Sequence, residues 1–84
     1  MTLTSKFWTV YLLRCEDGSV YKGCTADLSE RLQRHQKGEV KYTRTRLPVE
    51  LITYLVFQDK YKAFQFERYL KTGSGAAFAR KRLL

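Results

Sequence analysis

A carboxylate interrupts an apolar stripe in the second half of this chain. The stripe has the i, i+3, i+4, i+7 spacing of one helix face and comprises Ala63, Phe66, Glu67 and Leu70. A buried acid is unfavourable unless a partner compensates its charge. Two roles for Glu67 are open. It can form an ion pair with a neighbouring arginine, or it can bind Mg²⁺, which often takes only one or two protein carboxylates.

Four polar side chains in the first half offer complementary chemistry. Arg31 and His35 are four residues apart, as neighbours on one helix face are, and Tyr11 and Tyr21 lie in two segments rich in β-branched residues. Phosphodiester hydrolysis needs a positioned water, an acceptor for its proton, a cation near the phosphorane charge and help for the leaving oxygen. These residues with metal-bound Glu67 can supply all four. Each signal alone also fits a solvated helix face or a core tyrosine.

The two tyrosines belong to a predicted β-hairpin. Residues 8–14 and 20–23 are rich in β-branched and aromatic residues. The dipeptide Asp17-Gly18 between them is a turn signal. These segments are therefore the first two strands that we expect.

The register of this hairpin decides whether the tyrosines meet, because a one-residue slip moves every side chain to the opposite face. A two-residue loop pairs Leu13 with Lys22 and separates Tyr11 from Tyr21. A three-residue loop, with Gly18 in the left-handed conformation of a bulge, pairs Leu13 with Tyr21 and brings both tyrosines to one face. At the level of strand patterns, both registers are open.

Residues 27–38 predict a helix of about three turns. Asp27 has the spacing of a capping residue, and Gly38 is at the usual position after a helix. Leu28 and Leu32 form the expected buried stripe, with the Arg–His pair on an adjoining face.

The second half predicts one strand and two helices. Residues 49–57, VELITYLVF, form a dense apolar run that is typical of a central, well-buried strand. Asp59 is the expected cap of a helix that ends at residue 70 or 71. Gly73 stops that helix, and Ser74 is the expected cap of a short basic helix at the C-terminus.

The charge of the chain is strongly positive. Sixteen Lys and Arg against eight Asp and Glu give a formal net charge of +8. A basic surface attracts polyanions, so nucleic acid is the expected partner, with a solvated basic surface as the alternative. The candidate contacts include the segments KYTRTR and ARKR, in which Tyr42 can stack on an unpaired base. They are Lys22, Arg34, Lys41, Tyr42, Arg44, Arg46, Lys71, Arg80, Lys81 and Arg82.

Length, cysteines and hydropathy define the class of protein. The 84 residues make one domain, residues 1–84. Cys15 and Cys24 lack the spacing of a zinc site or a disulfide scaffold, so both are expected to be reduced. The first residues contain no apolar run of signal-peptide or membrane-span length. We expect a cytoplasmic protein with no membrane partner.

Several dissimilar pieces occur in a recognisable order along the chain. VYLL is followed by VYKG, then by DLSERLQRH, and later by FERYLKTG. In this order and spacing, from about residue 8 to residue 82, the chain resembles the GIY-YIG nuclease superfamily. It is most similar to the small stand-alone bacterial members. It is more distantly similar to the N-terminal nuclease domain of the bacterial excinuclease and to the catalytic domain of intron-encoded homing endonucleases.

The resemblance implies an α/β (α+β) domain in which helices flank a three-stranded antiparallel sheet, in the order β-β-α-β-α-α. It implies an endonuclease that hydrolyses DNA with Mg²⁺ or Mn²⁺, in repair or recombination. By position, Tyr11 and Tyr21 are the motif tyrosines, and one of them receives the proton of the attacking water or orients that water. Arg31 stabilises phosphate charge, His35 assists proton transfer or holds a tyrosine, and Glu67 holds the metal. The three-residue loop is the register that agrees with these roles.

The chain also departs from the family pattern. The first motif reads Thr9-Val10-Tyr11 and lacks its glycine, and the second has Lys22 at a usually apolar position. Many catalytic members carry an asparagine in the C-terminal helical region, and this chain has none. The alternative function is therefore a catalytically weak or inactive module that binds nucleic acid through the same fold and basic surface.

Overall fold

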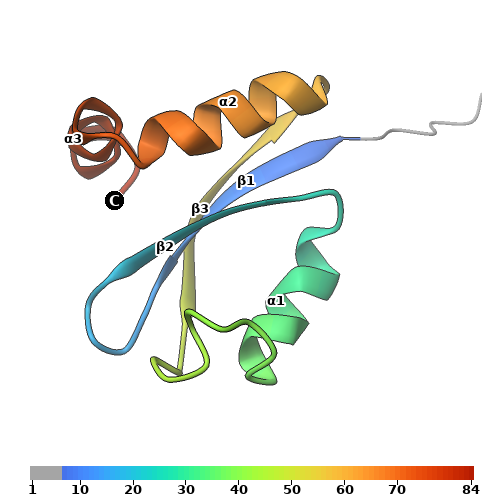
Figure 1. Ribbon diagram of the computed structural model, residues 1–84, viewed down its shortest axis with the longest axis vertical. Helices are drawn as coiled ribbons and strands as arrows, with labels where there is room; N and C mark the ends of the chain where they lie inside the picture. The colour runs from blue at the N-terminus through green and yellow to red at the C-terminus, as the bar shows by residue number, and fades with distance from the viewer. Residues whose placement is uncertain (1–6) are drawn as a thin grey trace, which may run out of the picture.

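Three antiparallel strands and three helices follow one another in the predicted order β-β-α-β-α-α (Figure 1). The computed structural model describes residues 7–84. The strands are β1 (Trp8–Arg14), β2 (Val20–Thr25) and β3 (Glu50–Phe57), and the helices are α1 (Leu28–Gln36), α2 (Lys60–Leu70) and α3 (Gly73–Arg82). The α+β fold class is confirmed.

The hairpin between β1 and β2 has the three-residue loop. Leu13 is paired with Tyr21, and Gly18 has a φ of 84°, the left-handed conformation that glycine adopts easily. The N–H of Gly18 donates to the carbonyl of Cys15 at 2.9 Å. Tyr11 and Tyr21 therefore project from the same face of the sheet, as the three-residue loop predicts.

The central strand is β1, and the prediction of a central, well-buried third strand is wrong. The strand order is β2-β1-β3, so β3 is an edge strand, and none of its residues is fully buried. Tyr54 and Val56 are each 54% exposed. An apolar run indicates a strand whose side chains pack against other residues. It does not indicate whether the strand has one or two neighbouring strands in the sheet.

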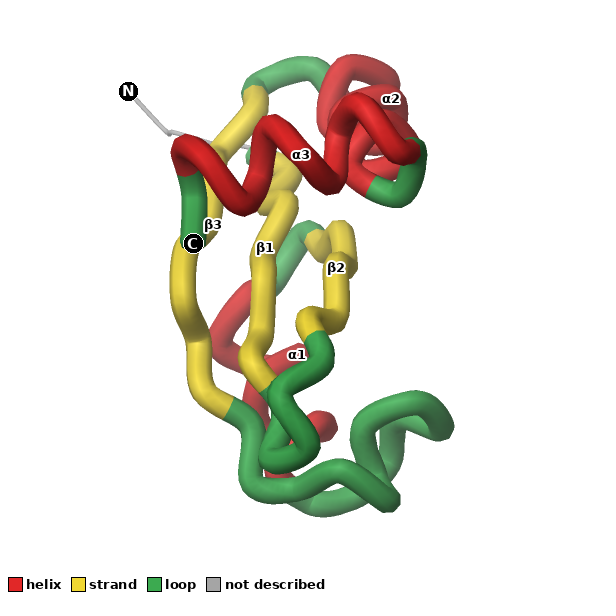
Figure 2. The backbone as a smooth tube through the Cα atoms, turned by 90° about the vertical axis from the view of Figure 1, so that its left-hand side faces the viewer, coloured by secondary structure: helices red, strands yellow, loops and turns green. Residues whose placement is uncertain are grey.

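The sheet separates two layers of helices. Figure 2 views it from the side of α3, with α1 behind the strands. Val10 and Leu12 of β1 face the α2 and α3 side, where they form the apolar core with Ala63, Leu70 and Ala79. Side chains alternate along a strand, so Tyr11 faces the α1 side, where the polar site lies.

Two of the three helices begin at the predicted capping residue. Asp27 accepts a hydrogen bond from the N–H of Glu30 at 3.0 Å, and Asp59 accepts from the N–H of Tyr61 at 2.8 Å. The predicted cap of α3 is wrong, because α3 begins at Gly73 and its cap is Thr72, whose hydroxyl accepts from the N–H of Gly75 at 3.1 Å. The chain turns from α2 into α3 so tightly that no room is left for a cap at Ser74.

The buried residue of α1 is not the predicted one. Leu28 and Leu32 are only half-buried, whereas His35 is fully buried. The face of α1 that carries His35 packs against the sheet. A hydrogen-bonded imidazole can be buried there at little cost in free energy.

Candidate active site

Tyr11 is fully buried on β1, and its ring lies against Gly23 of β2. The two residues are paired in the hairpin register. A Cβ atom at position 23 would overlap the ring and the hydroxyl of Tyr11. Overpacking of this kind is destabilising, so the glycine is what allows the buried tyrosine to occupy this place.

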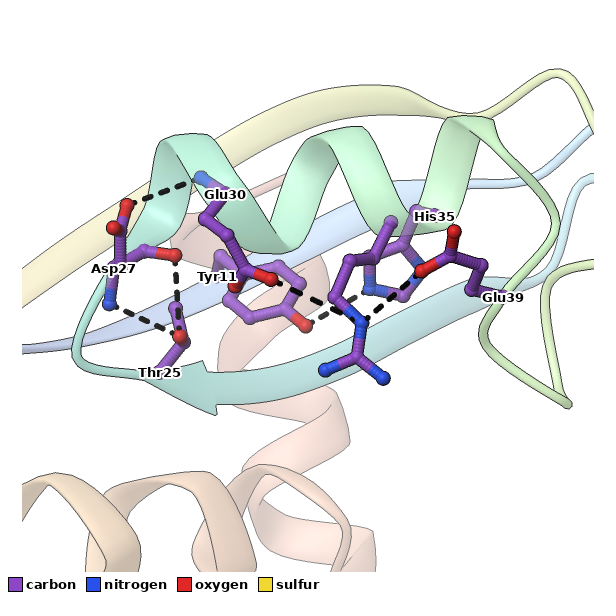
Figure 3. Close-up of polar contacts among 7 residues, drawn as sticks. Tyr11, Thr25, Asp27, Glu30, His35 and Glu39 are labelled. Atoms are coloured by element: carbon purple, nitrogen blue, oxygen red, sulfur yellow. Dashed lines mark hydrogen bonds and ion pairs between the residues drawn. The ribbon is translucent and has the colours of Figure 1, made fainter.

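A chain of buried hydrogen bonds links Tyr11 to two other elements. The Tyr11 hydroxyl lies 2.9 Å from Nε2 of His35, and Nδ1 of His35 lies 2.8 Å from the hydroxyl of Thr43. All three side chains are fully buried. Figure 3 shows Tyr11 between the sheet and α1, with its hydroxyl directed at His35. A neutral imidazole donates from one nitrogen and accepts at the other, so it joins the two hydroxyls in either tautomer.

Burial keeps this chain neutral. Desolvation lowers the pKa of His35, and the charges of Arg31 and Arg34 lower it further. Desolvation also raises the pKa of Tyr11 well above its ordinary value; Tyr21 adds to the rise, and Arg31 opposes it. Tyr11 therefore keeps its proton at neutral pH and acts as a hydrogen-bonding group.

A row of aromatic rings leads from Tyr11 to the surface. The ring of Tyr21 lies 6.1 Å from that of Tyr11, 4.9 Å from that of His35 and 5.6 Å from that of Tyr42, measured between centroids. Tyr42 is 40% exposed, whereas Tyr21 is half-buried. Of the two motif tyrosines, Tyr21 is the one that a substrate can reach.

Arg31 adds a positive charge beside this row of rings, and its guanidinium has a hydrogen-bond donor without a partner. It lies on α1 one turn before His35, and its Nε is buried without a hydrogen-bond partner in the part of the chain that the structure describes. A buried donor without an acceptor is unfavourable. The geometry of a guanidinium matches phosphate oxygens, and the half-buried Arg31 is therefore a candidate contact for a phosphate group.

Glu67 approaches β2 from α2. Its side chain is 15% exposed, and its carboxylate lies 2.9 Å from Nζ of Lys71. Burial raises the pKa of the Cys24 thiol; the charge of Glu67 raises it further, and the charge of Arg31 lowers it. The charges of the carboxylate and of the guanidinium thus both act on the Cys24 thiol, although the two groups come from helices in different layers.

The model of the GIY-YIG catalytic domain matches residues 7–81. The chain belongs to the GIY-YIG family. Its relatives include UPF0213 proteins, which are small stand-alone GIY-YIG proteins, as the resemblance predicts. Membership of this family supports a nuclease-type function with a nucleic acid as substrate.

Three relatives illustrate the similarity. A UPF0213 protein of Bacillus pumilus is 49% identical over 63 residues, which are 74% of this chain and 64% of that protein, so the match spans less than two thirds of its length. One of Cupriavidus pinatubonensis is 40% identical over 82% of this chain and 78% of its own. The solution NMR structure of a UPF0213 protein from Bacillus halodurans has 33% identity and a TM-score of 0.58, and the match covers 89% of this chain and 83% of that one.

GIY-YIG nucleases generally use a divalent metal ion, and the predicted ligand in this chain is Glu67. Within residues 7–84, no three His, Cys, Asp or Glu side chains gather as a metal cage would require. A single carboxylate nevertheless agrees with Mg²⁺ or Mn²⁺, which complete their coordination with water and phosphate oxygens. Lys71 would have to move away from the carboxylate when the ion binds.

Some of the predicted nucleic-acid contacts already form ion pairs within the protein. Arg34 is paired with Glu39 at 3.5 Å, and Lys71 with Glu67; Figure 3 shows Glu39 beside the end of α1. Arg46 is bonded to Asp17 at 3.0 Å and stacks 4.0 Å from the centroid of the Tyr42 ring. The ion pairs described for residues 7–84 do not include the other predicted cations, which are Lys22, Lys41, Arg44, Arg80, Lys81 and Arg82.

Thr43 is the site residue that sequence reasoning missed. It lies in the segment KYTRTR, whose composition is that of an exposed basic loop, yet it is fully buried and bonded to His35. A threonine among cations carries no periodic pattern that would predict burial. The only sequence feature that could have drawn attention to it is its small hydroxyl side chain among long charged ones.

A helix that crosses a bilayer needs about 20 predominantly apolar residues. In the region that the structure describes, no helix combines the length and apolar character needed to span a membrane.

Proposed function

We propose that this GIY-YIG protein is an endonuclease that hydrolyses DNA phosphodiester bonds with Mg²⁺ or Mn²⁺, in repair or recombination. The observation that carries the proposal is the unpartnered buried Nε of Arg31 beside the tyrosine row, with the largely buried carboxylate of Glu67, whose charge acts on the Cys24 thiol of β2. The site thus combines an arginine suited to phosphate, a carboxylate suited to a divalent cation and a reachable phenol. We further propose that it acts in the cytoplasm, where the free thiols of Cys15 and Cys24 stay reduced.

In the proposed reaction, Tyr21 orients the attacking water and accepts its proton. Tyr21 does so as a phenolate, which the nearby positive charge of Arg31 stabilises. The water oxygen attacks phosphorus, and the bond from phosphorus to the leaving oxygen breaks. Arg31 faces the charge that develops on the phosphate oxygens.

The other two polar groups have supporting roles in this proposal. His35, held by Thr43, fixes the hydroxyl of Tyr11. Tyr11 in turn sets the position of the Tyr21 ring, against which it packs. A divalent ion held by Glu67 would supply Lewis-acid stabilisation of the phosphate and of the leaving oxygen.

The second candidate function is a nucleic-acid-binding module without catalysis. The chain contains no asparagine, the residue that many catalytic members carry in the C-terminal helical region. Thr72, which lies in that region, caps α3, and Lys71 is paired with Glu67, so both side chains already have structural partners.

Cleavage of an end-labelled substrate panel separates the two candidates. The panel contains duplex, flap, forked and single-stranded DNA and a single-stranded RNA, each with Mg²⁺, Mn²⁺ or EDTA. Wild type is compared with Glu67→Ala and with the control Glu16→Ala, which removes an exposed carboxylate from the hairpin loop. We expect metal-dependent DNA products from wild type and the control, and none from Glu67→Ala.

Two results would contradict the proposal. Binding to every substrate without cleavage would establish the binding module in its place. Equal cleavage by wild type and Glu67→Ala would show that Glu67 is not a ligand of the catalytic metal ion.

A further inference from the structure

A second basic site lies on the face of the sheet opposite Tyr21. A cavity of about 350 Å³ lies between the β1–β2 hairpin and α3. Three of its lining residues are cations, Arg14, Lys22 and Arg80, and we call this site the basic hollow. The three come from β1, β2 and α3, so only the fold brings them together (Figure 2).

The walls of the basic hollow carry no acidic side chain. Its other lining residues are Gly18, Val20, Ala76, Ala79 and Leu84, and no ion pair joins the terminal carboxylate of Leu84 to the three cations. None of the three cations has a carboxylate partner among the ion pairs of residues 7–84, in contrast to Arg34, Arg46 and Lys71. Like charges around one hollow repel each other, and a bound anion would relieve that repulsion.

One acidic residue lies close to this site without neutralising it. Glu50 is the cross-strand partner of Arg14 in the pairing of β1 with β3. It lines a neighbouring cavity instead, together with Arg14. Its carboxylate is not within ion-pair distance of Arg14.

The basic hollow and the candidate active site lie on opposite sides of one edge strand. Lys22 is paired with Leu12, a residue of the apolar core, so it projects to the α3 face, whereas Tyr21 projects to the α1 face. Successive residues of a strand rise by about 3.3 Å, so the two sites are close along β2. Because β2 is an edge strand, a polyanion can pass from one site to the other over its free edge.

The position of Glu67 supports the same path. Glu67 belongs to α2, whose Ala63 and Leu70 pack against Leu12. Lys22 is paired with Leu12, so α2 lies on the face of the sheet to which Lys22 projects. Glu67 and the basic hollow thus lie along the same side of β2. A nucleic-acid backbone that contacts both Arg31 and Glu67 therefore passes close to Lys22.

We infer that the basic hollow binds one backbone phosphate of the nucleic-acid substrate, flanking the scissile phosphate, so that the bound strand crosses the edge of β2. This inference rests on the proposed function. Three cations and small apolar side chains offer nothing that distinguishes bases, so the contact sets the position of the strand and reads no sequence.

The test is a binding titration in EDTA, where cleavage does not interfere. A labelled DNA of the class that wild type binds best is titrated at several salt concentrations with Arg14→Ala, Lys22→Ala, Arg80→Ala and the triple variant. Lys62→Ala and Arg68→Ala are matched controls, because they remove exposed cations from α2 outside the hollow.

Binding to one phosphate predicts a specific pattern. Each variant should weaken binding, whereas the controls should not. The slope of log affinity against log salt should fall by about 0.9 in total for the triple variant, because one phosphate contact releases about one counterion. Arg80 is exposed on α3, so Arg80→Ala folds normally and gives a result even if Lys22→Ala is unstable.

Other outcomes overturn the inference. Slopes equal to those of the controls would show that no phosphate is bound there. A loss of about 0.9 for each cation separately would show scattered contacts in place of one site. Failure of wild type to bind any nucleic acid at low salt would contradict the proposed function itself, whereas normal wild-type binding with unchanged variants would reject only the basic hollow.

Discussion

Consecutive residues of β1 face two different interiors. Val10 and Leu12 project into an apolar core against α2 and α3. Tyr11, between them, projects to the other side, where a chain of hydrogen bonds joins it to His35 and Thr43. All five side chains are fully buried, so the two sides differ in chemistry and not in exposure.

The difference shows how this small chain combines an apolar core with a polar candidate site. Apolar contacts are non-directional and tolerate changes that conserve volume. A buried polar group needs each of its partners, because a lost hydrogen bond leaves a desolvated donor or acceptor. We therefore expect the core side to determine mainly the free energy of unfolding and the polar side to determine mainly the geometry of Tyr21.

Truncation on the core side should have the largest effect on stability. Leu12→Ala removes fully buried methyl groups and should lower the free energy of unfolding by about 2–5 kcal/mol. Urea denaturation followed by circular dichroism measures this loss. Leu12→Met, which nearly conserves volume, should cost less than about 1.5 kcal/mol. Unchanged cleavage per folded molecule is expected for both variants, and a large loss of activity in folded Leu12→Met would contradict the division between the two sides.

A change on the polar side should cost less stability and more activity. Thr43→Val keeps the shape of the side chain and removes the partner of His35 Nδ1, so unfolding should become easier by about 1–3 kcal/mol. We expect cleavage to fall because His35 no longer holds Tyr11. Thr43→Ser keeps the hydroxyl and should restore most of the activity. If Thr43→Val cleaved as fast as wild type, the hydrogen-bond chain would have only a structural role.

Lowering the pH should decrease the free energy of unfolding through the polar side alone. The folded pKa of His35 is depressed by burial and then by Arg31 and Arg34, so below about pH 6.5 the unfolded chain binds a proton that the folded chain does not. Stability is therefore full above that pH and falls below it, by at most about 1.4 kcal/mol per pH unit. His35 is the only histidine of the chain, so one ring resonance in an NMR titration gives its pKa.

The pH effect has a direct control. His35→Gln removes the titrating group, so its stability should lose this dependence between about pH 5 and pH 6.5. Hydrogen bonds from Ser19 lower the pKa of Asp17 from 3.8, which keeps that carboxylate out of the window. A slope that persisted in His35→Gln would assign the acid sensitivity to a different group.

Local patterns predicted much of the fold and part of the site. Asp27 and Asp59 cap the helices that their spacing predicts, because a cap depends only on neighbours in sequence. Glu67 lies on the expected helix stripe, where its partner is Lys71. In this structure that partner is the lysine that caps the C-terminal end of the same helix, and the alternative of a bound metal stays a proposal.

Two of the errors share a different cause. β3 is an edge strand although its composition resembles that of a central one, and Thr43 is buried although its neighbours are cations. Strand order and loop burial depend on residues far apart in the chain. Neither leaves a periodic pattern in the segment concerned.

The sequence by itself determined the elements, the hairpin alternatives, the basic charge and the set of residues with suitable chemistry, because each depends on residue type and short spacing. The tertiary structure decided the rest. It selected the three-residue loop, buried Tyr11 with His35 and Thr43, and brought Arg14, Lys22 and Arg80 around one hollow. Contacts between distant segments arise from the packing of the whole chain, and no short window of sequence contains that information.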